Sequence, residues 1–152
     1  MLREQINDAL KVAMRAKDDV GLRTVRLIIA ALKDRDIAAR GNGNCEGISD
    51  DELLGMLQSM VKQRKESMQL YVDGGRQELA DQEAAEIKVI ERFLPQQLGE
   101  DEMAEAVSNA IKSTGAGGIK DMGKVMGALK SDYAGRMDFS KASQIVKERL
   151  AT

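Results

Sequence analysis

The sequence contains no histidine and no tryptophan, and aromatic residues make up only 3% of its 152 positions. Histidine is the commonest general base and the usual zinc ligand in proteins, so its absence removes most designs of a hydrolytic or metal-dependent centre. Exposed aromatic rings are the platforms on which unpaired RNA bases stack, so base-by-base readout is not expected either. We therefore expect no catalytic residue, no metal site and no cofactor.

Cysteine and long apolar runs are also scarce. Cys45 is the single cysteine, which rules out an intrachain disulfide and is typical of a reducing compartment. Charged residues at Arg3, Glu4 and Asp8 interrupt the start of the chain, so it lacks the apolar core of a secretory signal. No stretch approaches the ~18 apolar residues of a membrane span. These features predict a soluble, cytoplasmic protein without membrane contacts.

Proline occurs once, at Pro95. Proline has no backbone N–H and disfavours the helical conformation in the residue before it, so a helix arriving at Phe93 should end there. The apolar pattern differs on the two sides of this point. We therefore predict two folding units, an N-terminal domain over residues 1–94 and a C-terminal domain over residues 95–152.

The N-terminal part repeats apolar residues at spacings of three and four, which predicts amphipathic helices. Short turns between them favour antiparallel hairpins. The predicted elements are a helix from about Leu2 to Ala16, a second capped by Asp18 or Asp19 and ending near Gly41, a third opening with the capping box Ser49–Glu52 and ending at Gly74–Gly75, and a fourth through Ala80, Ala84, Ile87 and Ile90 to Leu94.

The C-terminal part predicts three shorter helices separated by glycines. No segment in either part alternates polar and apolar residues as a strand would, so the predicted fold class is all-α. The expected helices are one capped at Gly99 and bearing Met103, Val107 and Ile111, one bearing Ile119, Met122, Val125, Met126 and Leu129 after the break at Gly115–Gly118, and one bearing Ala142, Ile145, Val146 and Leu150 after Asp138.

The segment Gly118–Val125 has the glycine and lysine spacing of a phosphate-binding loop. Val125 stands where such a loop needs a serine or threonine hydroxyl to hold magnesium, and a helix rather than a strand leads into it. Nucleotide hydrolysis is therefore not predicted. The carboxylate pair Glu83 and Glu86 and the basic run Lys62–Lys65 are interpreted as parts of solvated helix faces.

Gly123 and Gly127 fall on one side of the same predicted helix, bordered by Lys120 and Lys124. Glycine inside a helix costs about 1 kcal/mol relative to alanine, so two of them call for an explanation. One hypothesis is that they let another helix of the C-terminal domain approach closely. The other is that bare backbone fringed by lysines admits a sugar-phosphate backbone. Lys130, Arg136 and Lys141 would then extend the positive surface.

Three motifs carry a resemblance to a known family: Val61–Ser67, Glu91–Leu98 and Asp121–Gly127. Together they resemble the YqeY family, also called the GatB/YqeY family, along nearly the whole chain. The last motif is similar to the tail domain of the GatB subunit of the amidotransferase that amidates Glu-tRNA(Gln) or Asp-tRNA(Asn). The resemblance implies an all-helical body and tail, contact of the tail with tRNA, and catalytic steps located in other domains and subunits.

Two functions of different classes remain open at this point. The first is an accessory protein that binds tRNA and works beside aminoacyl-tRNA amidation, with amidotransferase subunits as further partners. The second is a helical protein–protein adaptor. A weaker third is an amidotransferase component, which the family implies as a carbon–nitrogen ligase with glutamine as amido donor. The candidate tRNA-binding residues are Lys120, Gly123, Lys124, Gly127, Lys130, Arg136 and Lys141.

Overall fold

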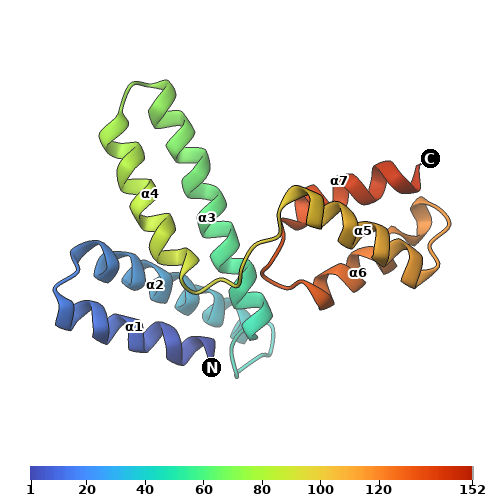
Figure 1. The fold of residues 1–152 in the computed structure, drawn as a ribbon. Coiled ribbons are helices and arrows are strands. Elements are labelled where there is room, and N and C mark those ends of the chain that lie inside the picture. The colour runs from blue at the N-terminus through green and yellow to red at the C-terminus, as the bar shows by residue number, and fades with distance from the viewer. Residues whose placement is uncertain (152) are drawn as a thin grey trace. The chain divides into compact units, whose positions relative to one another are not determined.

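The computed structural model of the protein describes residues 1–151, and that part of the chain consists of helices and connecting turns without a strand (Figure 1). The predicted all-α class is confirmed. The α-helices are α1 (Leu2–Ala16), α2 (Asp19–Gly41), α3 (Asp50–Asp73), α4 (Gln77–Glu91), α5 (Glu100–Thr114), α6 (Met122–Asp132) and α7 (Phe139–Leu150), and a short 3₁₀ helix, η1 (Ile119–Asp121), precedes α6.

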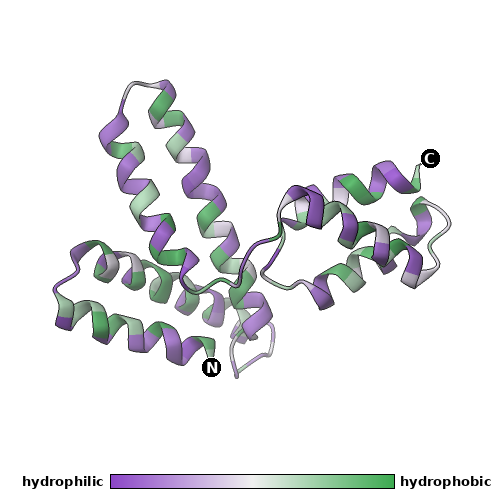
Figure 2. Ribbon diagram, in the orientation of Figure 1, coloured by the Kyte–Doolittle hydropathy of each residue, from purple (hydrophilic) through white to green (hydrophobic). Residues whose placement is uncertain are grey.

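The chain divides into two compact units, which we call unit 1 (Met1–Leu94) and unit 2 (Pro95–Thr152). Unit 1 contains α1 to α4, and unit 2 contains α5, η1, α6 and α7. Each unit buries its own aliphatic cluster. Figure 2 shows the physical basis, since the helices of both units carry apolar and polar residues in alternating patches rather than one kind throughout.

Side chains next to the helix ends explain where α2 and α3 begin. Asp18 caps α2 by accepting a hydrogen bond from the Gly21 amide at 3.0 Å. Ser49 and Glu52 form the predicted capping box of α3, in which the Glu52 amide donates to the Ser49 hydroxyl at 3.2 Å and the Ser49 amide donates to the Glu52 carboxylate at 2.8 Å. These contacts satisfy amides that have no partner within the helix.

The end of α4 differs slightly from the prediction. The α-helix stops at Glu91 rather than Phe93, and the chain continues to Leu94 through hydrogen bonds between residues three apart, such as Leu94 N to Glu91 O at 3.1 Å. This tighter 3₁₀ pattern is common in a last helical turn. Here it brings the chain to Pro95, which disfavours the helical conformation at Leu94.

Unit 1 is built from two hairpins, α1 with α2 and α3 with α4 (Figure 1). Their shared core includes Ile28, Leu53, Leu57 and Ile90, each with no exposed surface. Burying an aliphatic side chain of this size stabilises the fold by about 1.5–3 kcal/mol. Three helices meet at a further polar contact, where Glu86 of α4 pairs with Arg64 of α3 at 2.9 Å and with Arg23 of α2 at 3.6 Å.

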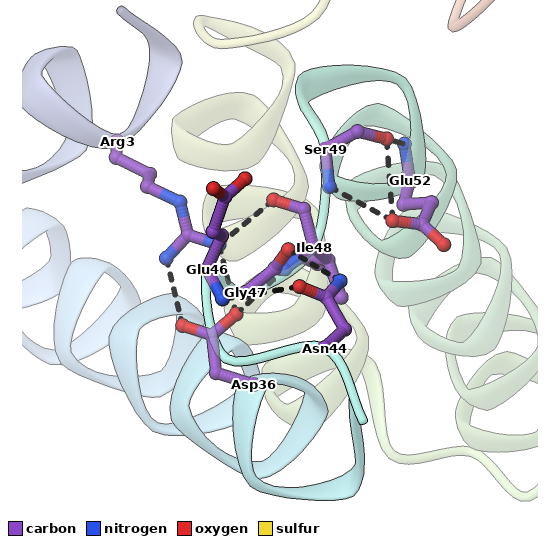
Figure 3. A network of polar contacts seen from close by, with 8 residues as sticks. All are labelled: Arg3, Asp36, Asn44, Glu46, Gly47, Ile48, Ser49 and Glu52. Carbon is purple, nitrogen blue, oxygen red and sulfur yellow. Dashed lines mark hydrogen bonds and ion pairs between the residues drawn. The ribbon is translucent and has the colours of Figure 1, made fainter. Parts of the chain in front are cut away.

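A polar clamp holds the loop between α2 and α3 (Figure 3). The Arg3 guanidinium, on α1, donates to both carboxylate oxygens of Asp36 on α2 at 2.7 and 2.8 Å. It also donates to the Ile48 carbonyl at 2.9 Å, while the Ile48 amide donates to Asp36 at 3.0 Å. Arg3, Asp36 and Ile48 thus join three parts of unit 1 by two-pronged, charge-assisted hydrogen bonds.

Unit 2 packs α5, α6 and α7 around Val107, Val125, Leu129 and Val146, none of which is exposed. The segment before α5 is tied to the turn after α6 by the Leu98 amide, which donates to the carbonyl of residue 136 at 2.8 Å. Ile119 was expected on the apolar face but is 52% exposed. It lies in η1, where about 120° rather than 100° separates successive residues, so the α-helical spacing misplaces it.

Gly43 and Gly47 provide a matched test of the clamp. Both have a positive φ, 89° and 93°, so alanine at either position should cost about 1–2 kcal/mol of backbone strain. A Cβ at Gly43 would meet nothing within 4 Å, whereas at Gly47 it would lie 2.7 Å from Asp36 Oδ1 and 2.8 Å from Arg3 Nη2. Urea unfolding should therefore show Gly47→Ala to be clearly less stable than Gly43→Ala. Equal losses would mean that the clamp is not closed around Gly47.

The clamp also predicts a pH dependence. The hydrogen bond from Arg3 lowers the pKa of Asp36 from its ordinary 3.8 to about 2, and the Ile48 amide adds to the shift against the opposing effect of burial. A carboxyl with a lowered folded-state pKa stabilises the fold above its unfolded pKa and loses this contribution as the pH falls toward the folded value. The stability difference between wild type and Asp36→Asn should be constant above pH ~4.5 and shrink between pH ~4 and ~2. A difference that does not change over this interval would contradict the assignment.

Candidate nucleic-acid interface

Helix α6 has one buried face and one exposed face. Val125 and Leu129 project into the core of unit 2 and have no exposed surface. Successive residues turn by about 100°, so the opposite side of the helix carries the predicted glycines and lysines. Those residues are all exposed, and we call them, with the lysine that precedes α6 in η1, the glycine–lysine face: Lys120, Gly123, Lys124, Gly127 and Lys130.

The structure decides between the two hypotheses for the glycines within unit 2. A Cβ built on Gly123 or on Gly127 would meet no atom within 4 Å. No helix of unit 2 therefore approaches either residue closely, and the packing hypothesis is wrong for contacts inside this unit. The two glycines cost about 1 kcal/mol each in helix stability and gain no internal contact in return. They leave a strip of helix backbone open to solvent.

The lysines of this face lie beside the bare strip. Lys120 and Lys124 are four residues apart and flank Gly123, and Lys130 follows Gly127 by three residues, which places its side chain near the same edge. Three acidic residues of unit 2, Glu100, Asp101 and Glu102, lie at the start of α5, where their charge complements the helix dipole. Asp121 directly precedes α6 and accepts a hydrogen bond from the Gly117 amide, and Asp132 is the last residue of α6. A positive surface thus surrounds exposed backbone without an intervening carboxylate in the first two turns of α6.

An exposed serine that was not predicted adjoins the glycine–lysine face. Ser131 is exposed and follows Gly127 by four residues, so it continues the same strip. Its hydroxyl can donate a hydrogen bond to a phosphate oxygen, as serines do at many nucleic-acid contacts. The spacing of three and four residues from Lys120 onward was the signal that could have identified it.

Arg136 and Lys141 are placed differently from the other candidates. Arg136 lies in the turn after α6, where its Nε donates to the Gln96 carbonyl at 3.2 Å and its guanidinium lies 5.9 Å from the centre of the Tyr133 ring. These contacts hold Arg136 in the fold of unit 2. Lys141 is exposed in the first turn of a different helix, α7. The continuous part of the candidate surface is therefore the glycine–lysine face.

The structure also shows where three other features noted in the sequence lie. The segment that imitates a phosphate-binding loop enters α6, so Gly123 and Lys124 are part of a helix rather than a loop. Glu86 and Arg64 were expected on solvated helix faces, but they pair with each other and each side chain is only 14% exposed. Cys45 is exposed in the loop between α2 and α3.

Residues 1–151 contain no cluster of three or more histidine, cysteine, aspartate or glutamate side chains arranged to hold a metal ion. Among the helices of the same residues, none combines the length and the apolar character needed to cross a membrane.

Comparison with known proteins adds a family. A family model described as Yqey-like protein matches residues 3–150. A protein of Lachancea thermotolerans named "Altered inheritance of mitochondria protein 41, mitochondrial" is 30% identical over 88% of this chain and 74% of its own length. Proteins of the same name from Vanderwaltozyma polyspora and Saccharomyces cerevisiae are 33% and 25% identical, and their matches cover 44% and 65% of their own lengths.

These names correct one expectation. A cytoplasmic location was expected from the sequence, whereas the related proteins are named as mitochondrial. The physical reason for the error lies in the criterion used. An apolar leader marks secretion, whereas import signals for mitochondria are amphipathic and rich in arginine, so a search for apolar runs does not distinguish the mitochondrion from the cytoplasm.

The open space above Gly127 predicts that alanine is stabilising there. Gly127→Ala should raise the free energy of unfolding by about 0.5–1 kcal/mol, because alanine has the higher helix propensity and meets no neighbour. Gly55→Ala is a matched control in α3, since Gly55 is also exposed and would also meet nothing within 4 Å. Chemical unfolding should show a gain for both variants. A loss for Gly127→Ala together with a gain for Gly55→Ala would show that Gly127 is covered in the folded protein.

Proposed function

This chain belongs to the YqeY family, and we propose that it is an accessory protein that binds tRNA through unit 2 and works beside tRNA-dependent amidation. The observation that carries the proposal is the exposed strip of backbone at Gly123 and Gly127, which costs stability and gains no contact inside the unit. Such a strip has a use when another molecule approaches the helix backbone closely. The lysines that border it favour a polyanion over a neutral surface.

The chemistry of the face suits the sugar-phosphate backbone of RNA. Lysine ammonium groups pair with phosphates, and Ser131 adds a hydroxyl donor. Aromatic side chains are lacking on this face, so it offers no surface on which unpaired bases would stack. The expected mode is therefore recognition of backbone and shape, as in folded regions of tRNA.

The link to amidation is supported by the resemblance of Asp121–Gly127 to the tail of the GatB subunit. In this proposal the chain contributes RNA contacts, and the phosphoryl and amide chemistry belongs to other subunits. Amidotransferase subunits are then its expected protein partners. If those subunits co-purify with a tagged chain in a tRNA-dependent manner, the link to amidation is supported. If they do not co-purify at native expression levels, the link to amidation is wrong, but the proposed RNA binding is not affected.

The RNA contact can be tested by charge reversal. Lys120→Glu with Lys124→Glu should weaken tRNA binding at least tenfold for all tRNAs alike, because backbone contacts carry no sequence information. The slope of log affinity against log salt should fall by about 1.4–1.8, since each lost phosphate contact removes about 0.7–0.9. Filter binding or fluorescence anisotropy over a salt series measures both quantities.

Lys62→Glu with Lys65→Glu is the matched control, because it makes the same charge change at exposed positions of α3 in unit 1. It should leave the salt slope nearly unchanged. Gly127→Ala supplies an independent readout, since it should weaken RNA binding while the fold becomes more stable. Unchanged binding by the Lys120 and Lys124 variant, with its fold intact, would exclude the proposal and favour the adaptor alternative.

A further inference from the structure

An apolar groove of about 440 Å³ crosses unit 1 over helix α2. Its walls come from α1 on one side and from the end of α4 with Arg92 and Phe93 on the other. Both α1 and α4 pack against α2, but they make little contact with each other (Figure 1). The groove therefore occupies the position between two helices where a further helix could lie on the same support.

The lining of the groove is shaped for a helix with large side chains. Ala9, Ala13 and Ala16 project from α1 along one wall, and Gly21 lies on the floor. Because these residues are small, the backbone of a neighbouring helix can approach them closely. At the edge stands Val12, an apolar side chain that is 62% exposed. A groove filled by aliphatic side chains of a partner would bury this surface.

The two rims carry opposite charges. Asp8 lines the rim on α1, and its side chain is 74% exposed with Lys11 at 3.8 Å as its ion-pair neighbour. Arg92 lies on the rim at the end of α4 and is exposed. Asp18 also lines the groove, but its carboxylate caps α2 through the Gly21 amide. A helix lying in the groove would therefore meet the Asp8 carboxylate along one flank and the Arg92 guanidinium along the other. Charges of this kind fix the orientation of a partner more than they add affinity.

We propose that this groove binds one amphipathic helix of a partner protein. The apolar face of that helix carries bulky aliphatic residues at spacings of three and four, with basic residues on the flank toward Asp8 and acidic residues on the flank toward Arg92. This is the helix-in-groove mode of recognition. It is independent of the RNA contact in unit 2, so either proposal can fail without the other.

The probe is a synthetic helical peptide of 15 residues, the length of α1, with leucines at the stated spacing, lysines on one flank and glutamates on the other. Its binding to the full chain is followed by fluorescence anisotropy. Val12→Gln should raise the Kd at least tenfold. Met14→Gln is the matched control, because Met14 lies on the same helix outside the groove and is similarly exposed at 54%. It should change the Kd less than twofold.

Charge reversal of the rims tests the orientation. The variant with Asp8→Lys and Arg92→Glu should bind the original peptide at least fivefold more weakly and should prefer a peptide whose lysine and glutamate flanks are exchanged. Circular dichroism confirms the fold of each variant. If Val12→Gln proves unfolded, this rim variant still decides the question because both substituted residues are exposed.

Three outcomes would overturn the proposal. The first is no saturable binding of either peptide, and the second is an equal loss of affinity in the Val12 and Met14 variants. The third is a concentration-dependent dimer of the chain that Val12→Gln abolishes, because the groove would then be covered by a second copy rather than by a partner helix.

Discussion

Burial of one apolar face per helix is the constraint on which this structure depends. Its α-helices have 11 to 24 residues, and helices of such length are marginal or weakly stable alone in water. In unit 2, three helices share one small core that includes Val107, Val125 and Leu129. The opposite face of each helix is therefore not buried in this core. The glycine–lysine face is the exposed side of α6. In unit 1 the same constraint makes α2 a shared support that contacts α1, α4 and, less extensively, α3, and the groove lies over α2 between α1 and the end of α4.

Features determined by neighbours in sequence could be predicted well. The caps at Asp18 and Ser49, the helix breaks at the glycines and the apolar spacings all act within one or two turns, so the pattern indicates the helices and the all-α class correctly. The membership of the glycine–lysine face follows from the same periodicity. The one local error of note, Ile119, arose because a 3₁₀ turn does not share the α-helical period.

Features determined by distant residues could not be predicted. A helical wheel indicates which residues share a face but not what lies opposite, so it left open whether Gly123 and Gly127 were packed or bare. Arg136 was expected to extend the positive surface, and its hydrogen bond to the Gln96 carbonyl, 40 positions earlier, could not be foreseen. The clamp joins Arg3 and Asp36, which are 33 positions apart, and no local sequence pattern indicates that they pair. Such contacts are set by tertiary packing, which a single sequence does not display.

The clamp can form only after a long stretch of the chain has been synthesised. Arg3 is synthesised before its partners, because the carbonyl that accepts its hydrogen bond belongs to Ile48, 45 positions later. The clamp cannot form until the loop after α2 has left the ribosome. During that interval the apolar faces of α1 and α2 have only each other to cover them, because α3 and α4 are still to be made. The interval in which unit 1 is exposed to chaperones and to aggregation thus ends only when α3 and α4 have been made.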